Sequence, residues 1–169
     1  MSAKPVLVVG SSNTDMIIKM ERIPKPGETI LGGEFAMAAG GKGANQAVGA
    51  ARAGGKVIFV ARVGRDMFGD KAIAGFKADG IDVRHIVRDQ ATPSGVALIF
   101  VGSDGENSIA VASGANGKLG TADLPAKNVF ERAGVVVLQL ETPLPTVKAA
   151  AKLAASAGVP VILNPAPAR

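Results

Sequence analysis

Five polar side chains of the 169-residue sequence have the chemistry to hold an oxygen-rich ligand. Two carboxylates, two carboxamides and one ammonium group can together donate hydrogen bonds to the hydroxyls of a sugar and accept hydrogen bonds from them. The five residues are Asn13, Asp15, Lys42, Asn45 and Glu141. Taken singly, each is more often a turn, cap or surface residue. Their convergence at one place in the fold favours a polar binding site.

The stretch GGKGAN is the part of the sequence most like a nucleotide-binding loop, yet it matches neither common motif. A Walker A loop requires Ser or Thr where Gly43 stands, and a dinucleotide fingerprint requires a third glycine where Gln46 stands. What remains is the amino end of a predicted helix, with exposed backbone N–H groups, a positive dipole end and Lys42. Such a site suits an anion or sugar hydroxyls, whereas the structural alternative is a tight turn before a closely packed helix.

Fully apolar runs alternate with helical segments along most of the chain. The predicted strands are Val6 to Val9, Val57 to Ala61, Val135 to Leu140 and Val159 to Leu163. The predicted helices run from Gly43 to Ala53, from the cap Asp66 to Asp79, and from the cap Thr142 to Gly158. This alternation predicts a parallel sheet covered by helices on both faces. Because ligands of such sheets bind outside the carboxyl ends of the strands, Asp15 and Glu141 are expected there.

Two further segments depart from the alternation. Ile30 to Met37 reads as one strand, and Val96 to Val101 with Ser108 to Ala112 reads as a hairpin around a Gly- and Asp-rich turn. They predict a small antiparallel sheet that projects from the main sheet as a lid, built from approximately residues 12–37 and 95–113. The single histidine, His85, is interpreted as a surface or packing residue.

The composition restricts the class of protein. Hydrophobic residues make up 47% of the chain and charged residues 20%, as in ordinary globular proteins. The net charge is +5, but no two basic residues are adjacent and Trp and Tyr are absent, which argues against a nucleic-acid partner. No apolar run approaches the ~18 residues of a membrane span, so a cytoplasmic location is expected. The absence of Cys and the single His argue against a thiolate or histidine metal site.

Several stretches resemble the PfkB-type carbohydrate kinase family. They are VVGSSNTD, PKPGET, AGGKGANQA with Gly54 and Gly64 after it, GVALIFV, SGAN and LNPAPAR. The resemblance extends over essentially all of residues 1–169 and corresponds to the amino-terminal part of such kinases. It implies a ribokinase-like, three-layer α/β domain with a small β lid.

The resemblance also implies a function. The implied reaction is ATP-dependent phosphorylation of D-ribose at its 5-hydroxyl, with Mg²⁺ and a monovalent cation such as K⁺, in a homodimer formed through the lid. The implied sugar-binding residues are Asn13, Asp15, Gly41, Lys42, Asn45 and Glu141, with apolar lid contacts from Ala97, Ile99 and Val111. The alternatives are another sugar or nucleoside kinase of the family, or a non-catalytic sugar-binding or dimerisation module.

One departure from the family pattern concerns the chemical step. Phosphoryl transfer needs a base, metal ligands and donors for the developing charge. The family carries its base in a Gly-Ala-Gly-Asp motif and a metal-site residue in an Asn-x-x-Glu motif, and neither occurs here. Asp15 is not expected to replace the base, because its family counterpart holds sugar hydroxyls. The chain alone is therefore expected to be a truncated domain without turnover, and the bare apolar strand Val159 to Leu163 agrees with this.

Overall fold

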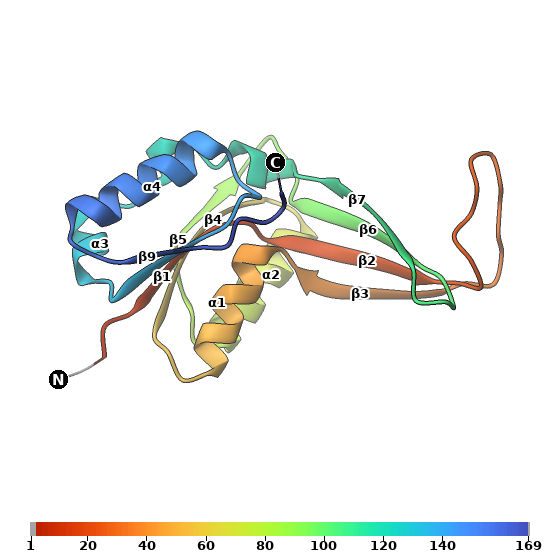
Figure 1. The fold of residues 1–169 in the computed structure, drawn as a ribbon, viewed down its shortest axis with the longest axis horizontal. Coiled ribbons are helices and arrows are strands. Elements are labelled where there is room, and N and C mark those ends of the chain that lie inside the picture. Colours follow the sequence, from red (N-terminus) through yellow and green to blue (C-terminus); the bar gives the residue numbers. More distant parts are fainter. Residues whose placement is uncertain (1–2, 169) are drawn as a thin grey trace.

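Two β-sheets organise the structure, a computed structural model that describes residues 3–168 (Figure 1). The main sheet has five strands in the order β5–β4–β1–β8–β9, and all neighbours pair in parallel. Its strands are β1 Val6–Val9, β4 Val57–Gly64, β5 Asp82–Asp89, β8 Val135–Leu138 and β9 Val161–Leu163. The predicted parallel sheet is thus confirmed.

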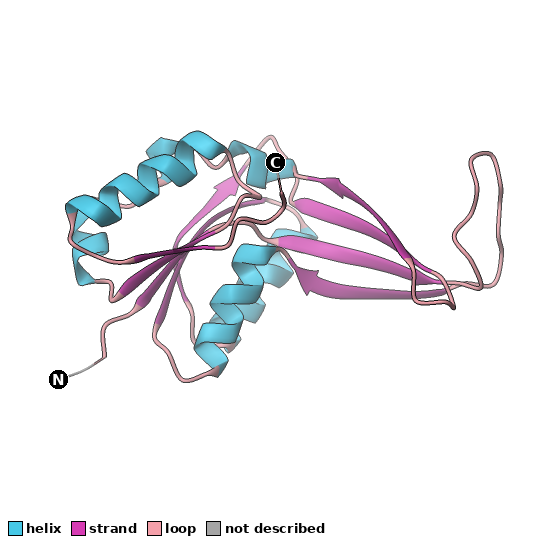
Figure 2. Cartoon of the chain, in the orientation of Figure 1, coloured by secondary structure: helices cyan, strands magenta, loops and turns pink. Residues whose placement is uncertain are grey.

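Helices cover both faces of the main sheet (Figure 2). They are α1 Lys42–Arg52 and α2 Met67–Ala78 on one face, and α3 Lys127–Arg132 and α4 Leu144–Ser156 on the other. Successive side chains of β1 enter opposite cores, as the pleat of a strand requires. Val8 packs in the cluster that contains Phe76 of α2, whereas Leu7 packs in the cluster that contains Phe130 of α3. The result is the expected three-layer α/β domain.

The second sheet projects from the carboxyl ends of the main strands as a lid (Figure 1). Its order is β3–β2–β6–β7, with β2 Asn13–Lys19, β3 Glu34–Gly40, β6 Gly95–Val101 and β7 Asn107–Ala112. The outer pairs are antiparallel as predicted, but β2 and β6 pair in parallel. Both of these strands leave the main sheet outward, β2 after β1 and β6 after β5, which makes the lid a mixed sheet. The 3₁₀ helices η1 Gly114–Lys118 and η2 Thr121–Asp123 follow the lid.

Two local predictions need correction. Thr142 was predicted to cap the last helix, but α4 begins after the N-cap Pro143, and the buried Thr142 hydroxyl has no hydrogen-bond partner within residues 3–168. Strand β5 was not predicted at all, because this edge strand carries polar residues such as Arg84 and His85. By contrast, Asp66 does cap α2, since its carboxylate accepts a hydrogen bond from the Gly69 N–H at 2.8 Å. In the described residues, no helix is long and apolar enough to cross a membrane.

Candidate functional site

The carboxyl ends of β1 and β8 meet at the centre of the main sheet and set the position of the site. The chain leaves β1 through the lid and α1 toward β4, whereas it leaves β8 through α4 toward β9 on the other side. The strand order therefore reverses between β1 and β8, and ligands of open α/β sheets bind in the crevice outside such a reversal. Ser11 follows β1 and Glu141 follows β8, so both border this crevice.

Glu141 is anchored to the loop after β1 and to the amino end of α1. Its Oε2 atom accepts hydrogen bonds from the Ser11 hydroxyl at 2.5 Å and from the backbone N–H of Lys42 at 2.8 Å. The Lys42 ammonium lies 3.6 Å from Oε1 of the same carboxylate. A carboxylate in this position is stabilised by the positive end of the helix dipole. The predicted convergence of Lys42 and Glu141 is therefore present in the structure.

The backbone N–H groups at the start of α1 are already bound within the protein. Besides the Lys42 N–H, the Gly43 N–H donates to the Ser11 hydroxyl at 3.2 Å and the Ala44 N–H donates to the Ser11 carbonyl at 2.8 Å. The expectation of exposed backbone donors for a ligand was wrong, because Ser11 and Glu141 cap this helix from outside it. The groups that this helix end leaves for a ligand are the side chains of Lys42 and Asn45.

Gly41 is the N-cap of α1 and allows the glycine-rich stretch to touch the start of the lid. Its φ of 92° lies in the left-handed region, which glycine adopts without steric cost. A Cβ on Gly41 would lie 2.8 Å from the backbone nitrogen of Asn13 and 2.9 Å from Cα of Ser12. A larger residue would therefore separate α1 from the loop that leads into β2.

Asp15 of β2 lies half-buried near the anchored carboxylate. Burial raises the pKa of Asp15 above its ordinary value of 3.8, the negative charge of Glu141 raises it further, and Lys42 lowers it in part. A Cβ on Gly40 would lie 2.2 Å from Oδ1 of Asp15, so the carboxylate lies directly over the glycine. Asp15, Lys42 and Glu141 thus form one electrostatically coupled group across the junction of lid and main sheet.

The two asparagines occupy different surroundings. Asn13 is buried and lines two hollows, a cleft of about 620 Å³ along α1 and α2 and a smaller one of about 150 Å³ that Glu141 and Val111 also line. Asn45 is exposed and lines only the larger cleft. Neither hollow includes Asp15 or Lys42 in its lining. Of the two predicted carboxylates, Glu141 alone lines a hollow, the smaller one, and Asn13 connects the two hollows.

The three apolar lid residues lie on the same face of the lid as Asp15. Asp15 pairs with Ala97 of β6, which in turn pairs with Val111 of β7, so the three form one row across the sheet. Ile99 is two residues beyond Ala97 and therefore on that face as well. Val111 is 54% exposed, whereas Ala97 is only 4% exposed and offers little surface to a ligand.

Two residues of this region were not singled out from the sequence. Ser11 links Glu141 to α1, and the buried Asn116 of η1 binds the backbone of Ser12 and the side chain of Asn13. One signal for Ser11 was its place two residues after a fully apolar strand. For Asn116 the only signal was its motif SGAN, which gave no partner.

The described residues do not form a metal site of their own. Between residues 3 and 168, no group of three or more His, Cys, Asp or Glu side chains could hold a metal ion. Asp15 and Glu141 are two carboxylates, and one of them is engaged by Ser11 and Lys42.

The chain is similar in sequence to known sugar kinases. The ribokinase of Haemophilus influenzae is 43% identical to the chain over 167 residues, which are 98% of this chain and 55% of that protein. The deoxyribokinase of Salmonella typhi is 40% identical over 164 residues, which are 96% of this chain and 54% of that protein. The chain thus spans about half the length of these curated relatives.

The fold is also shared with solved structures. The structure of Arabidopsis thaliana ribokinase complexed with ribose and ATP matches with a TM-score of 0.85 and 38% sequence identity, covering 98% of this chain and 54% of that one. The profile of the pfkB family of carbohydrate kinases matches residues 3–169. The chain therefore belongs to the pfkB family of carbohydrate kinases.

Proposed function

We propose that the protein takes part in the ATP-dependent phosphorylation of D-ribose at its 5-hydroxyl, giving ribose 5-phosphate. The observation that carries the proposal is the coupled group of Asp15, Lys42 and Glu141 at the strand-order reversal, bordered by the lid. Relatives named ribokinase, at about 40% identity over nearly all of this chain, support the same reaction. The proposal assigns to the described residues the binding of the sugar.

Each proposed sugar-binding residue has a defined hydrogen-bonding role. Asp15 and Glu141 accept hydrogen bonds from sugar hydroxyls, and Lys42, Asn13 and Asn45 donate to them. Gly41 lets the sugar approach the backbone, and the lid residues Ile99 and Val111 cover its apolar side, whereas Ala97, only 4% exposed, adds little to this cover. A pentose offers several hydroxyls that each donate and accept, which matches this mixture of acceptors and donors.

The co-substrate is proposed to be ATP, with Mg²⁺ and a monovalent cation such as K⁺. When bound, Mg²⁺ neutralises the charge that develops on the transferred phosphoryl group. Residues 3–168 hold no cluster of acids for the metal, so no step involving it is assigned to them. Their contribution is to fix the sugar so that one hydroxyl is presented for transfer, and proximity of this kind is a large part of phosphoryl-transfer catalysis.

The lid is the proposed contact of a homodimer. Large apolar side chains are exposed on it, including Phe35 at 62% and Ile109 at 54%. Phe35 pairs with Ile18, whereas Ile109 pairs with Ile99, which in turn pairs with Ile17. Because Ile17 and Ile18 are successive residues of β2, the two exposed side chains lie on opposite faces of the lid. We also propose that the intact protein is cytoplasmic. Light scattering of the intact protein tests the dimer, and a monomer at all concentrations contradicts the proposed lid contact.

One relative favours a second candidate substrate. The deoxyribokinase of Salmonella typhi is nearly as similar to the chain as the ribokinases are. Deoxyribose differs from ribose by one hydroxyl, so the two candidates differ by a single hydrogen-bonding group in the site.

A sugar panel on the intact protein decides between these substrates. ADP release is measured with ribose, 2-deoxyribose and fructose in the presence of ATP, Mg²⁺ and K⁺. The proposal predicts saturable activity with the highest kcat/KM for ribose. A preference for 2-deoxyribose selects the second candidate, and activity with neither pentose refutes both.

A further inference from the structure

The buried residue Asn116 makes three hydrogen bonds to the start of the lid. Its Oδ1 atom accepts from the Ser12 N–H at 2.8 Å, and its Nδ2 atom donates to the Ser12 carbonyl at 3.1 Å. Nδ2 also donates to Oδ1 of Asn13 at 2.7 Å. Asn116 is 2% exposed and belongs to η1, the segment that follows the last lid strand. It therefore connects the chain leaving the lid with the chain entering it.

These bonds determine which way the amide of Asn13 points. A backbone N–H can only donate, so the atom of Asn116 that faces Ser12 N must be its oxygen. The Nδ2 atom of Asn116 is then the one directed at Asn13, and only the oxygen of Asn13 can accept from it. The orientation of both amides thus follows from one backbone donor rather than from an arbitrary choice between oxygen and nitrogen.

Gly95 provides the space for this contact. A Cβ on Gly95 would lie 2.2 Å from Nδ2 of Asn116 and 2.2 Å from Oδ1 of Asn13. Any side chain at this position would enter the Asn13–Asn116 hydrogen bond. The bond can therefore be disturbed without changing either asparagine.

The remaining polar atom of Asn13 is left for a ligand. Its Nδ2 has no hydrogen-bond partner in the part of the chain that the structure describes, and Asn13 lines both hollows of the site. Asp15, two residues later on β2, lies on the same face of the lid. A hydroxyl between them accepts from Asn13 Nδ2 and donates to the Asp15 carboxylate, whereas a carbonyl oxygen satisfies only the amide.

We infer that Asn116 is a positioning residue that makes Asn13 a hydrogen-bond donor to the substrate and so selects a hydroxyl at this position. The inference rests on the proposed sugar-kinase function. It differs from a purely structural role, in which Asn116 only ties the two ends of the lid together. A structural role predicts equal losses for all sugars, whereas the positioning role predicts a change in which hydroxyls matter.

The test uses three variants of the intact protein and the 1-, 2- and 3-deoxy analogues of ribose. Asn116→Asp places an acceptor opposite Asn13, so Asn13 is expected to turn its NH₂ toward Asp and its oxygen toward the sugar. Gly95→Ala breaks the same contact without a change in charge. Asn128→Asp, on the exposed surface of α3, is the matched control for the added charge.

In the unaltered protein, at least one deoxy analogue is expected to lose about 10-fold or more in kcat/KM, because the Asn13 donor is then unpaired. In Asn116→Asp and Gly95→Ala, kcat/KM for ribose falls by about 10-fold or more. In the same variants, kcat/KM for that deoxy analogue falls little below its value in the unaltered protein. The KM for ATP stays unchanged in both variants. The control Asn128→Asp keeps the kcat/KM values of the unaltered protein for ribose and its analogues. An unaltered ratio between ribose and its analogues in both variants overturns the inference and leaves a structural role.

Failure of the proposed function is recognised separately. If the unaltered protein phosphorylates no sugar, the function is wrong, and the inference is judged from the side-chain NH₂ resonances of Asn13 and Asn116 without ligand. Slow hydrogen exchange at Asn116 and fast exchange at Asn13, with Asn13 becoming slow in Asn116→Asp, supports the orientation. Slow exchange at Asn13 in the unaltered protein overturns it.

Discussion

Asp15 opposes folding at neutral pH, as the direction of its pKa shift shows. An acid whose pKa is raised by folding binds its proton more tightly in the folded state than in the unfolded state. The carboxylate therefore becomes unfavourable for folding as the pH rises above its ordinary pKa of 3.8. A half-buried carboxylate beside Glu141 contributes to binding rather than to stability, under the proposed function.

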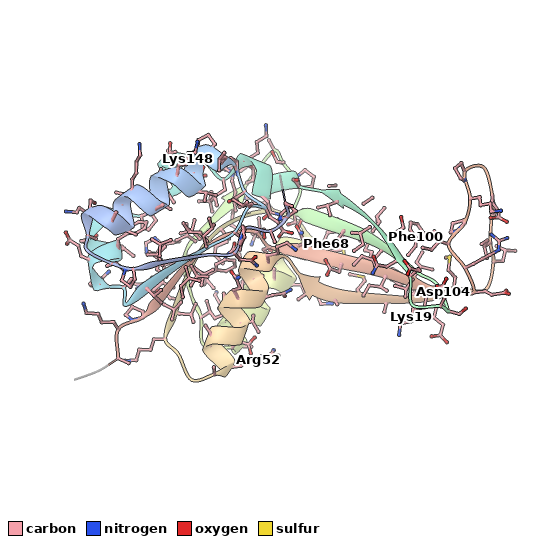
Figure 3. The ribbon with its side chains drawn as sticks, in the orientation of Figure 1. Lys19, Arg52, Phe68, Phe100, Asp104 and Lys148 are labelled. Atoms are coloured by element: carbon pink, nitrogen blue, oxygen red, sulfur yellow. The ribbon has the colours of Figure 1, made fainter. Side chains whose placement is uncertain are left out.

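Asp15→Asn is therefore expected to raise Tm at pH 7 while weakening ribose binding by about 10- to 100-fold. A hydrogen bond to an ionised group contributes about 1.5–3 kcal/mol, which corresponds to that factor. Scanning calorimetry and ribose titration of the intact protein measure the two effects. Asp104→Asn, at the far end of the lid (Figure 3), is the control and should change neither. A lower Tm or undiminished affinity in Asp15→Asn contradicts this account.

At the scale of elements, Arg62 connects two strands and a 3₁₀ helix. From β4 it donates to Asp89, at the end of β5, at 2.8 Å and to Asp123 of η2 at 3.0 Å. The hydrogen bond from Arg62 lowers the pKa of Asp89 to about 2, helped by the backbone N–H groups of Ala91 and Thr92. This group holds the edge strand β5 to the rest of the main sheet.

The Asp89 interaction predicts acid sensitivity. Its pKa is lower in the folded state, so its stabilisation is fully present above the ordinary value of 3.8 and is lost as the pH falls from about 4 to about 2. Asp89→Asn should lower Tm at pH 7 and flatten the fall of Tm between pH 4 and pH 2. Asp70→Asn, which removes an exposed partner of Arg88, should do neither. If Tm falls equally between pH 4 and pH 2 in Asp89→Asn and in the unaltered protein, the ion pair between Arg62 and Asp89 does not stabilise the fold.

Most of the main sheet could be predicted from the sequence for a physical reason. Strands buried on both faces must be apolar along their length, and β1, β4 and β8 carry that pattern. The edge strand β5 has one unpaired side and tolerates Arg84 and His85, so it lacked the pattern. The parallel β2–β6 pair of the lid depends on where the two strands leave the main sheet, which no local pattern records.

The site could be predicted only in part. Asp15, Lys42 and Glu141 were recognisable because charged residues follow apolar strands or begin a helix. Ser11 and Asn116 were not, because their partners are 130 and 104 residues away in the sequence. The same long-range contacts explain why the helix N–H groups of α1 were wrongly expected to be free.

At the scale of the whole molecule, the candidate site is divided between two bodies. The main domain supplies Lys42 and Glu141, and the lid supplies Asp15 with its apolar neighbours (Figure 1). A sugar bound by all of them would hold the lid against the main sheet. Binding therefore depends on the assembled molecule and not on any one segment.

Ribose titration of the intact protein by calorimetry tests the central claim most directly, using Lys42→Gln and Lys148→Gln. Lys42→Gln removes the ammonium group but keeps the backbone N–H that binds Glu141, and Lys148 lies on the outer side of α4 as a matched control (Figure 3). The account predicts one ribose site in the unaltered protein and in Lys148→Gln, with about 10- to 100-fold weaker binding in Lys42→Gln. Equal ribose affinity in all three proteins, or no ribose binding in any, would contradict it.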